Sequence, residues 1–138
     1  MMFDREPRTV ETIETRFRTI RTAIPVPGTQ EVLERLEKCE ARSMQGQLPV
    51  VWDRAENATV FDAAGNRWID CTSAIFLANV GHSNPRVLEA IRAAVDRPLV
   101  SCYAYANEIR ATYQERLVAW AGPPFEKSYL VSSGSEAT

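Results

Sequence analysis

The final ten residues, YLVSSGSEAT, constrain the fold of this chain more than any other stretch. The residues leading to Val131 predict a strand over residues 127–131, and the serine- and glycine-rich turn after it leads into the start of a helix. A strand followed by a helix is the opening of an α/β unit. Because one strand cannot form a sheet by itself, we expect this unit to be incomplete within the 138 residues.

The turn has the composition of a small anion site. Ser133 followed three positions later by Glu136 predicts a capping box, in which a hydroxyl and a carboxylate satisfy backbone N–H groups. Gly134 lets the backbone approach a ligand closely, and the first turn of a helix presents unpaired N–H groups. With the hydroxyl of Ser135, the pattern suits a phosphate. The alternative, a well-capped helix without a ligand, stays open on this motif alone.

Composition excludes several functional classes. The 16 basic and 18 acidic residues give a net charge of −2, which favours neither nucleic acid nor an anionic membrane as a partner. No apolar run approaches the roughly 20 residues of a membrane span, and the N-terminus lacks the apolar segment of a signal peptide. Three widely spaced cysteines suggest reduced thiols and a cytoplasmic location. His82 is the only histidine, which argues against a histidine-rich metal site and against a serine–histidine–aspartate triad.

Apolar spacing and turn residues predict the elements before residue 70. Apolar residues three and four apart predict a helix that Thr9 caps and the sequence IPVPG ends. Thr29 is expected to cap a second helix, which ends before Gly46. Residues 49–70 then predict a hairpin around the turn DAAGN, with residues 50–52 as a candidate third strand. The apolar faces expected of the two helices are Val10, Ile13, Phe17 and Ile20, and Val32, Leu33, Leu36 and Cys39.

The remaining residues predict a loop and two helices before the final turn. Residues 73–80 are small and apolar, and we expect an extended segment or a buried loop. Asn84 and Pro85 predict the start of one helix, and Gly122 predicts the end of another over residues 107–121. The chain therefore divides into two regions, 1–95 and 96–138. The buried faces expected of these helices are Val87, Leu88, Ile91, Ala94 and Val95, and Ile109, Tyr113, Leu117 and Trp120.

Three blocks occur in an order and spacing that resemble one enzyme family. They are DRAENATVFDAAGNRWID, similar to an N-terminal hairpin, NVGHSNPRVLEAI, similar to an N-x-GH-x-x-P-x-V-x-x-AI block, and YLVSSGSEAT, similar to a strand followed by SGSEA. These blocks resemble the class III (subgroup II) aminotransferases, fold type I enzymes that use pyridoxal 5′-phosphate. The resemblance covers residues 23–138. Within the family, TAIP and DRAEN are most similar to the 4-aminobutyrate aminotransferases.

The resemblance implies an α/β fold, as the amino-terminal fragment of a fold type I transferase that uses pyridoxal phosphate. Residues 1–95 would belong to its small domain, and residues 96–138 would begin the large cofactor-binding domain. The implied reaction is ping-pong transfer of an amino group from an amine or ω-amino acid to a 2-oxo acid. Another class III reaction, such as decarboxylation or an aminomutase reaction, and a non-catalytic truncated module remain alternatives. The family implies a homodimer, with no nucleic acid or membrane partner.

The resemblance also implies two groups of site residues. The first group holds the cofactor phosphate, and the second lines the substrate side of the pocket. The alternative for the second group is a structural role, in which its isoleucine is buried in the core and its aromatic side chains contribute only to packing. The residues expected to hold the phosphate are Gly134, Ser135 and the adjoining Ser133. The residues expected to line the substrate side are Ile75, Tyr103 and Tyr105.

The family's chemistry needs a lysine that reacts with the cofactor aldehyde and an acidic partner for the pyridine nitrogen. In the family pattern both lie beyond the end of this sequence. Lys38 and Lys127 are the only lysines, and neither matches the reactive position. We therefore assign no catalytic residue here. The 138-residue chain alone is expected to be inactive, and transamination is expected of a longer parent protein.

Overall fold

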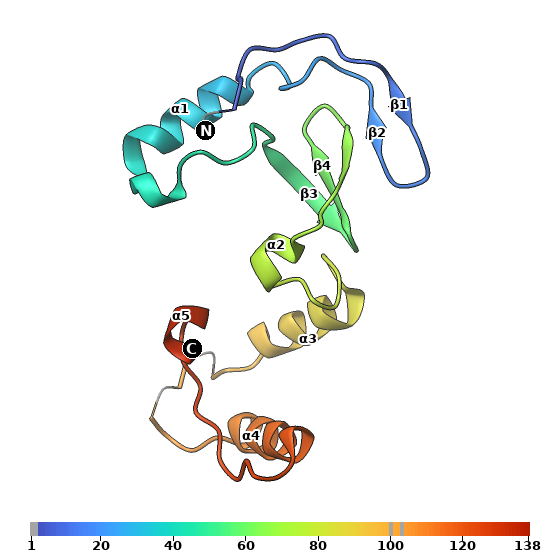
Figure 1. Cartoon of the computed structure of the whole chain (residues 1–138). Helices are drawn as coiled ribbons and strands as arrows, with labels where there is room; N and C mark the ends of the chain where they lie inside the picture. The colour runs from blue at the N-terminus through green and yellow to red at the C-terminus, as the bar shows by residue number, and fades with distance from the viewer. Residues whose placement is uncertain (1–2, 100, 103) are drawn as a thin grey trace. The chain divides into compact units, whose positions relative to one another are not determined.

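The computed structural model of the chain describes residues 3–99, 101–102 and 104–138. It contains two compact units, residues 1–92 and residues 93–138, and each is considered by itself (Figure 1). The division falls inside helix α3 (Pro85–Val95). The domain boundary expected at residue 95 concerns the domains of a whole enzyme, and it stays a prediction. No helix among the described residues is both long enough and apolar enough to cross a membrane.

A five-stranded antiparallel sheet, in the order β1-β2-β5-β4-β3, organises residues 1–92. Val60 of β4 lies opposite Ala55 of β3 and opposite Trp68 of β5. The hairpin expected around DAAGN is confirmed, and the third strand forms slightly later than expected. The strands are β1 (Ile13–Glu14), β2 (Thr19–Ile20), β3 (Trp52–Glu56), β4 (Thr59–Asp62) and β5 (Arg67–Ile69).

The helix expected near residues 10–20 is wrong, because this segment forms the β1–β2 hairpin (Figure 1). The hydroxyl of Thr15 closes the turn by accepting hydrogen bonds from Phe17 N (3.3 Å) and Arg18 N (2.9 Å). β2 then pairs with β5, which buries Thr19 and Ile20. The β-branched residues of this segment favour a strand, and sheet pairing overrides the helical spacing of its apolar residues.

A buried polar network joins this hairpin to the β4–β5 turn. Asn66 is 1% exposed, and its Nδ2 donates to Asp62 Oδ2 (2.9 Å) and Thr22 Oγ1 (2.7 Å). Its Oδ1 accepts from Arg21 N (2.8 Å). Asp62 also accepts from Asn66 N (2.9 Å) and from Trp68 Nε1 (3.2 Å). Buried polar groups stabilise a fold only when they are hydrogen-bonded, so this network fixes how the two hairpins meet.

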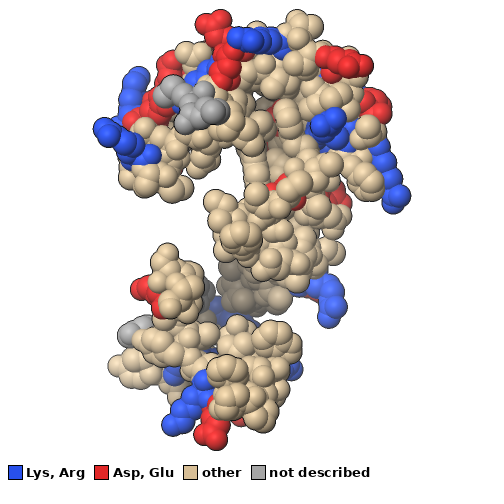
Figure 2. Space-filling model, viewed as in Figure 1, with Lys and Arg blue, Asp and Glu red and all other residues tan. Residues whose placement is uncertain are grey.

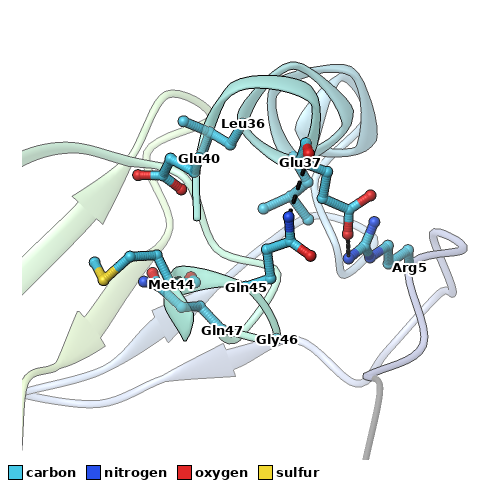
Figure 3. A pocket seen from close by; sticks show the side chains of 9 residues that line it. Arg5, Leu36, Glu37, Glu40, Met44, Gln45, Gly46 and Gln47 are labelled. Atoms are coloured by element: carbon cyan, nitrogen blue, oxygen red, sulfur yellow. Dashed lines mark hydrogen bonds and ion pairs between the residues drawn. The ribbon is translucent and has the colours of Figure 1, made fainter. Parts of the chain in front are cut away.

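An ion pair attaches the N-terminal segment to α1 (Thr29–Cys39). Arg5 lines a pocket between the end of α1 and the 3₁₀ turn η1 (Arg42–Met44), where its guanidinium meets the Glu37 carboxylate (Figure 3). The hydrogen bond to Glu37 raises the pKa of Arg5, and the same bond lowers the pKa of Glu37. Gln45 Nε2 donates to the backbone oxygen of Glu37 at 3.2 Å, which ties the segment after α1 to the helix.

The helices predicted to begin near Thr29, at Pro85 and near Asn107 form close to their predicted positions, with one difference in capping. Gly28, rather than Thr29, is the N-cap of α1, and it makes no side-chain hydrogen bond. Asn107 caps α4 by accepting from Arg110 N at 2.9 Å, and Gly122 follows the last helical residue with a φ of 68°. The helices other than α1 are α2 (Ser73–Phe76), α3 (Pro85–Val95), α4 (Glu108–Ala121) and α5 (Gly134–Ala137).

The apolar faces expected to be buried are mostly exposed. Among the described residues the buried apolar side chains are those of Ile20 and Val60, both in the sheet, and that of Pro25. No described element packs extensively across the other faces. Charged side chains of both signs intermingle on the visible face of residues 1–92 (Figure 2). The exposed residues are Val10, Phe17, Leu36, Cys39, Val87, Ile91, Ala94, Val95, Ile109, Tyr113 and Trp120, and the half-buried ones are Ile13, Val32, Leu33, Leu88 and Leu117.

The strand expected over residues 127–131 does not form. A strand is defined by hydrogen bonds to a neighbour, and the described part of residues 93–138 contains no other strand that could pair with it. Ser128, in this segment, instead hydrogen-bonds the side chain of Gln114 on α4.

Replacing Asn66 with Ala should lower the free energy of unfolding of residues 1–92 by about 2–4 kcal/mol, because it leaves buried partners without hydrogen bonds. Urea unfolding followed by tryptophan fluorescence measures this loss. Asn79→Ala is the matched control, since Asn79 is exposed and its Nδ2 donates only to Phe76 O (2.9 Å). Equal losses in the two variants would contradict a special role of the network.

Candidate functional site

The final turn forms the capping box that the sequence predicts. Ser133 is the N-cap of α5, and its Oγ accepts from Glu136 N at 3.3 Å. The same hydroxyl donates to Glu136 Oε2 at 2.9 Å. The carboxylate reaches one residue further back than expected, because it accepts from Ser132 N at 3.1 Å. The hydroxyl proton of Ser133 is therefore committed to the cap.

The start of α5 leaves the donors that an oxyanion needs. In an α-helix the first N–H groups have no acceptor within the helix. Within the described residues no backbone acceptor is paired with the N–H groups of Gly134 and Ser135. A Cβ built on Gly134 would meet no atom within 4 Å, so the space in front of the turn is open. The exposed Ser135 adds a hydroxyl, and this donor set fits a phosphate.

A second unusual turn lies in residues 1–92, directly after β5. Ser73, Ala74, Ile75 and Phe76 all have positive φ values, between 51° and 67°. The expectation of an extended segment or a buried loop is wrong, because the residues form one left-handed helical turn, in which Phe76 N donates to Thr72 O (2.8 Å). For residues other than glycine this conformation costs about 1–2 kcal/mol each, so the surrounding structure must hold it.

The side chain of Asp70 holds the left-handed turn. Its Oδ1 accepts from the backbone N and the hydroxyl of Thr72, both at 2.8 Å. Its Oδ2 accepts from Ala74 N (2.9 Å), inside the turn, and lies 2.7 Å from His82 Nε2. The Asp70 side chain is 3% exposed and that of His82 13%. Four hydrogen-bonding groups thus converge on one buried carboxylate.

His82 is itself fixed by the sheet. Its backbone N and O pair with Asn57 at 2.8 and 2.9 Å, and its ring meets Trp52 edge-on at a centroid distance of 5.7 Å. The backbone of Gly81 also lies close to Asn57, because a Cβ on Gly81 would be 3.2 Å from Asn57 Cα. A pocket adjoins the pair, and its lining includes Asn57, Asp70, Ser73, Asn79 and His82.

The hydrogen bond from His82, with those from Thr72 and Ala74, holds the pKa of Asp70 well below its usual range, against the opposing effect of burial. The folded state therefore binds fewer protons than the unfolded state near pH 4. The stabilisation from Asp70 is fully present above that pH, and it is lost as the pH falls toward the lowered pKa.

Two of the three substrate-side candidates are solvent-exposed. Ile75, at the centre of the left-handed turn, is 73% exposed, which contradicts the alternative of a buried core isoleucine. Tyr105 is 81% exposed, and its backbone oxygen accepts a hydrogen bond from Cys102 Sγ at 3.2 Å. Tyr103 lies outside the described residues. The roles of Ile75 and Tyr105 stay predictions, as does the role of the phosphate turn.

Sequence reasoning missed Asp70 and the left-handed turn. The signal was present in part, since Asp70 followed two residues later by Thr72 is a pattern in which a carboxylate bonds nearby backbone N–H groups. Its pairing with His82, twelve positions along the chain, depends on tertiary structure. Among the described residues no group of three or more histidine, cysteine or acidic side chains is placed to hold a metal ion.

The sequence profile of the family "Aminotransferase class-III" matches residues 41–138. A 4-aminobutyrate aminotransferase of Mycobacterium leprae is 35% identical over 124 residues, covering 87% of this chain and 27% of the relative. An acetylornithine aminotransferase of Methanosarcina acetivorans is 34% identical over 118 residues, covering 86% of this chain and 29% of the relative. The chain thus spans less than a third of the length of these relatives.

Solved structures agree with the sequence comparison. The acetylornithine aminotransferase of Elizabethkingia anophelis has a TM-score of 0.68 and 31% identity, over 79% of this chain and 28% of that one. A taurine:2-oxoglutarate aminotransferase of Bifidobacterium kashiwanohense, solved in complex with pyridoxal phosphate and glutamate, has a TM-score of 0.58 and 27% identity, over 69% of this chain and 22% of that one. This chain therefore belongs to the class III aminotransferase family, and it has the corresponding part of the fold of these pyridoxal-phosphate-dependent enzymes.

Proposed function

We propose that this chain supplies the phosphate-binding turn and part of the substrate pocket of a pyridoxal-phosphate-dependent transaminase. The reaction moves an amino group from an amine or ω-amino acid to a 2-oxo acid by a ping-pong mechanism. The observation that carries the proposal is a family match across residues 41–138 that includes a capped turn with two available N–H groups. Class III aminotransferases use pyridoxal phosphate, and this turn has the donors for its phosphate.

In this proposal the backbone N–H groups of Gly134 and Ser135, together with the Ser135 hydroxyl, donate hydrogen bonds to the cofactor phosphate. Ser133 acts differently, because its hydroxyl proton already bonds Glu136. It keeps the two N–H groups in position by capping the helix. Open space at Gly134 lets the phosphate come close to the backbone.

Pyridoxal phosphate, when bound, supplies a carbonyl that reacts with amines and a ring that withdraws electrons. The chain's own contribution is to hold the phosphate and to line the substrate side with Ile75, Tyr103 and Tyr105. Lys38 and Lys127 are both exposed, and the proposal gives neither of them the role of the reactive lysine. That role falls to a residue outside the two units described here.

The amino donor we propose is an aliphatic amine or ω-amino acid. The relatives include enzymes named for 4-aminobutyrate, ornithine and acetylornithine. All three compounds carry an amine on a short aliphatic chain, which an exposed apolar side chain such as Ile75 suits. We also propose a cytoplasmic homodimer, with Val10 and Phe17, exposed beside the N-terminal hairpin, as apolar surface for the contact.

Amino transfer should be measurable with the longer parent protein that contains this chain, purified and saturated with pyridoxal phosphate. With 4-aminobutyrate or ornithine as donor and 2-oxoglutarate as acceptor, we expect glutamate to form at a rate that depends on both substrates. Protein from which the cofactor has been removed is the control. Release of carbon dioxide from the donor without glutamate would contradict transamination and would favour a decarboxylase.

Replacing Ser135 with Ala should weaken the binding of pyridoxal phosphate by about 10- to 100-fold, because one hydrogen bond to a charged group is lost. Equilibrium dialysis of the protein against the cofactor measures this change. Ser132→Ala is the matched control, since Ser132 contributes its backbone N–H, and not its side chain, to the turn. Equal affinities of the Ser135→Ala variant and the unaltered protein would contradict the assigned phosphate contact.

A further inference from the structure

Four consecutive residues with left-handed backbone, none of them glycine, are the most strained segment of the described chain. A turn of this kind persists only where the surrounding structure over-determines it. The side chains at its centre and end do not explain it by packing, because Ile75, Phe76 and Leu77 are 73%, 79% and 82% exposed. What holds the turn must therefore be polar.

Asp70 is the polar group that contacts the turn from inside. Its Oδ2 accepts from Ala74 N, the second residue of the left-handed segment, at 2.9 Å. The same oxygen lies 2.7 Å from His82 Nε2, so one oxygen atom joins the turn to the histidine. His82 is in turn bound through its backbone to Asn57, next to the end of β3. A continuous chain of contacts thus leads from the sheet through His82 and Asp70 to the turn.

We propose that Asp70 and His82 form a positioning pair that locks the left-handed turn of residues 73–76 and thereby sets how Ile75 meets the amino donor. The part of this inference that concerns the donor rests on the proposed function. The lock itself is a property of residues 1–92. Neither residue is assigned contact with substrate or cofactor, so both act through the turn.

Three variants separate the hydrogen bonds from the packing. Asp70→Asn keeps the size of the side chain and replaces one oxygen with a nitrogen. The variant therefore loses the oxygen that Ala74 N and His82 Nε2 share, or the one that accepts both Thr72 hydrogen bonds. His82→Phe keeps an aromatic ring against Trp52 and removes the donor. His82→Gln keeps a donor and removes the ring. Asp53→Asn, an exposed aspartate in β3, is the matched control.

The first readout is hydrogen exchange of individual backbone amides in the purified protein. In Asp70→Asn and His82→Phe, the amides of Ala74, Phe76 and Leu77 should exchange about tenfold faster or more, while those of β4 stay unchanged. His82→Gln should restore part of the protection, and Asp53→Asn should match the unaltered protein. Unchanged exchange in the turn would overturn the lock, and so would an equal rise in the turn and in β4.

The second readout is donor preference, which a purely structural loss would lower equally for all donors. In the cofactor-loaded parent protein, the ratio of kcat/KM for 4-aminobutyrate to that for ornithine should change about threefold or more in Asp70→Asn. If amide exchange shows that the turn has opened but both kcat/KM values fall by the same factor, the proposal that the turn positions the donor is overturned. An unaltered protein without transaminase activity would contradict the proposed function, and amide exchange would then decide the lock by itself.

Discussion

Two buried carboxylates, one before and one after strand β5, carry the hydrogen bonds on which the fold of residues 1–92 depends. Asp62 accepts hydrogen bonds from Asn66 in the β4–β5 turn. Asn66 in turn accepts from the backbone N–H of Arg21, which follows the N-terminal hairpin. Asp70 binds the turn that follows β5 and connects it to His82. Because few apolar side chains are buried among the described residues, these polar contacts decide which segments lie together.

In both candidate turns, residues 133–136 and residues 70–76, a carboxylate accepts hydrogen bonds from backbone N–H groups. At residues 133–136 a carboxylate and a hydroxyl satisfy some of the backbone N–H groups and leave others for a ligand. At residues 70–76 a carboxylate accepts from the backbone N–H groups of Thr72 and Ala74, and it holds a conformation that exposes the apolar side chain of Ile75. The first turn suits an anion, and the second suits an aliphatic group. In the proposed function, the first turn would hold the cofactor phosphate and the second would face the amino donor.

Local signals in the sequence predicted local structure well. The DAAGN hairpin, the end of α4 at Gly122 and the Ser133–Glu136 capping box are each specified by residues within a few positions of one another. The predictions failed where distant partners decide. The segment around Thr15 became a hairpin because β5 pairs with β2, and residues 127–131 formed no strand for lack of a neighbour. The Asp70–His82 contact was missed for the same reason.

A crystal structure of the protein with pyridoxal 5′-phosphate bound tests the central claim most directly. The account predicts phosphate oxygens at hydrogen-bond distance, about 2.7–3.2 Å, from Gly134 N and Ser135 N, with the Ser135 hydroxyl as a further donor. Ser133 should still bond Glu136 in that structure. A phosphate held by other residues, with the turn at 133–136 facing solvent, would contradict the account.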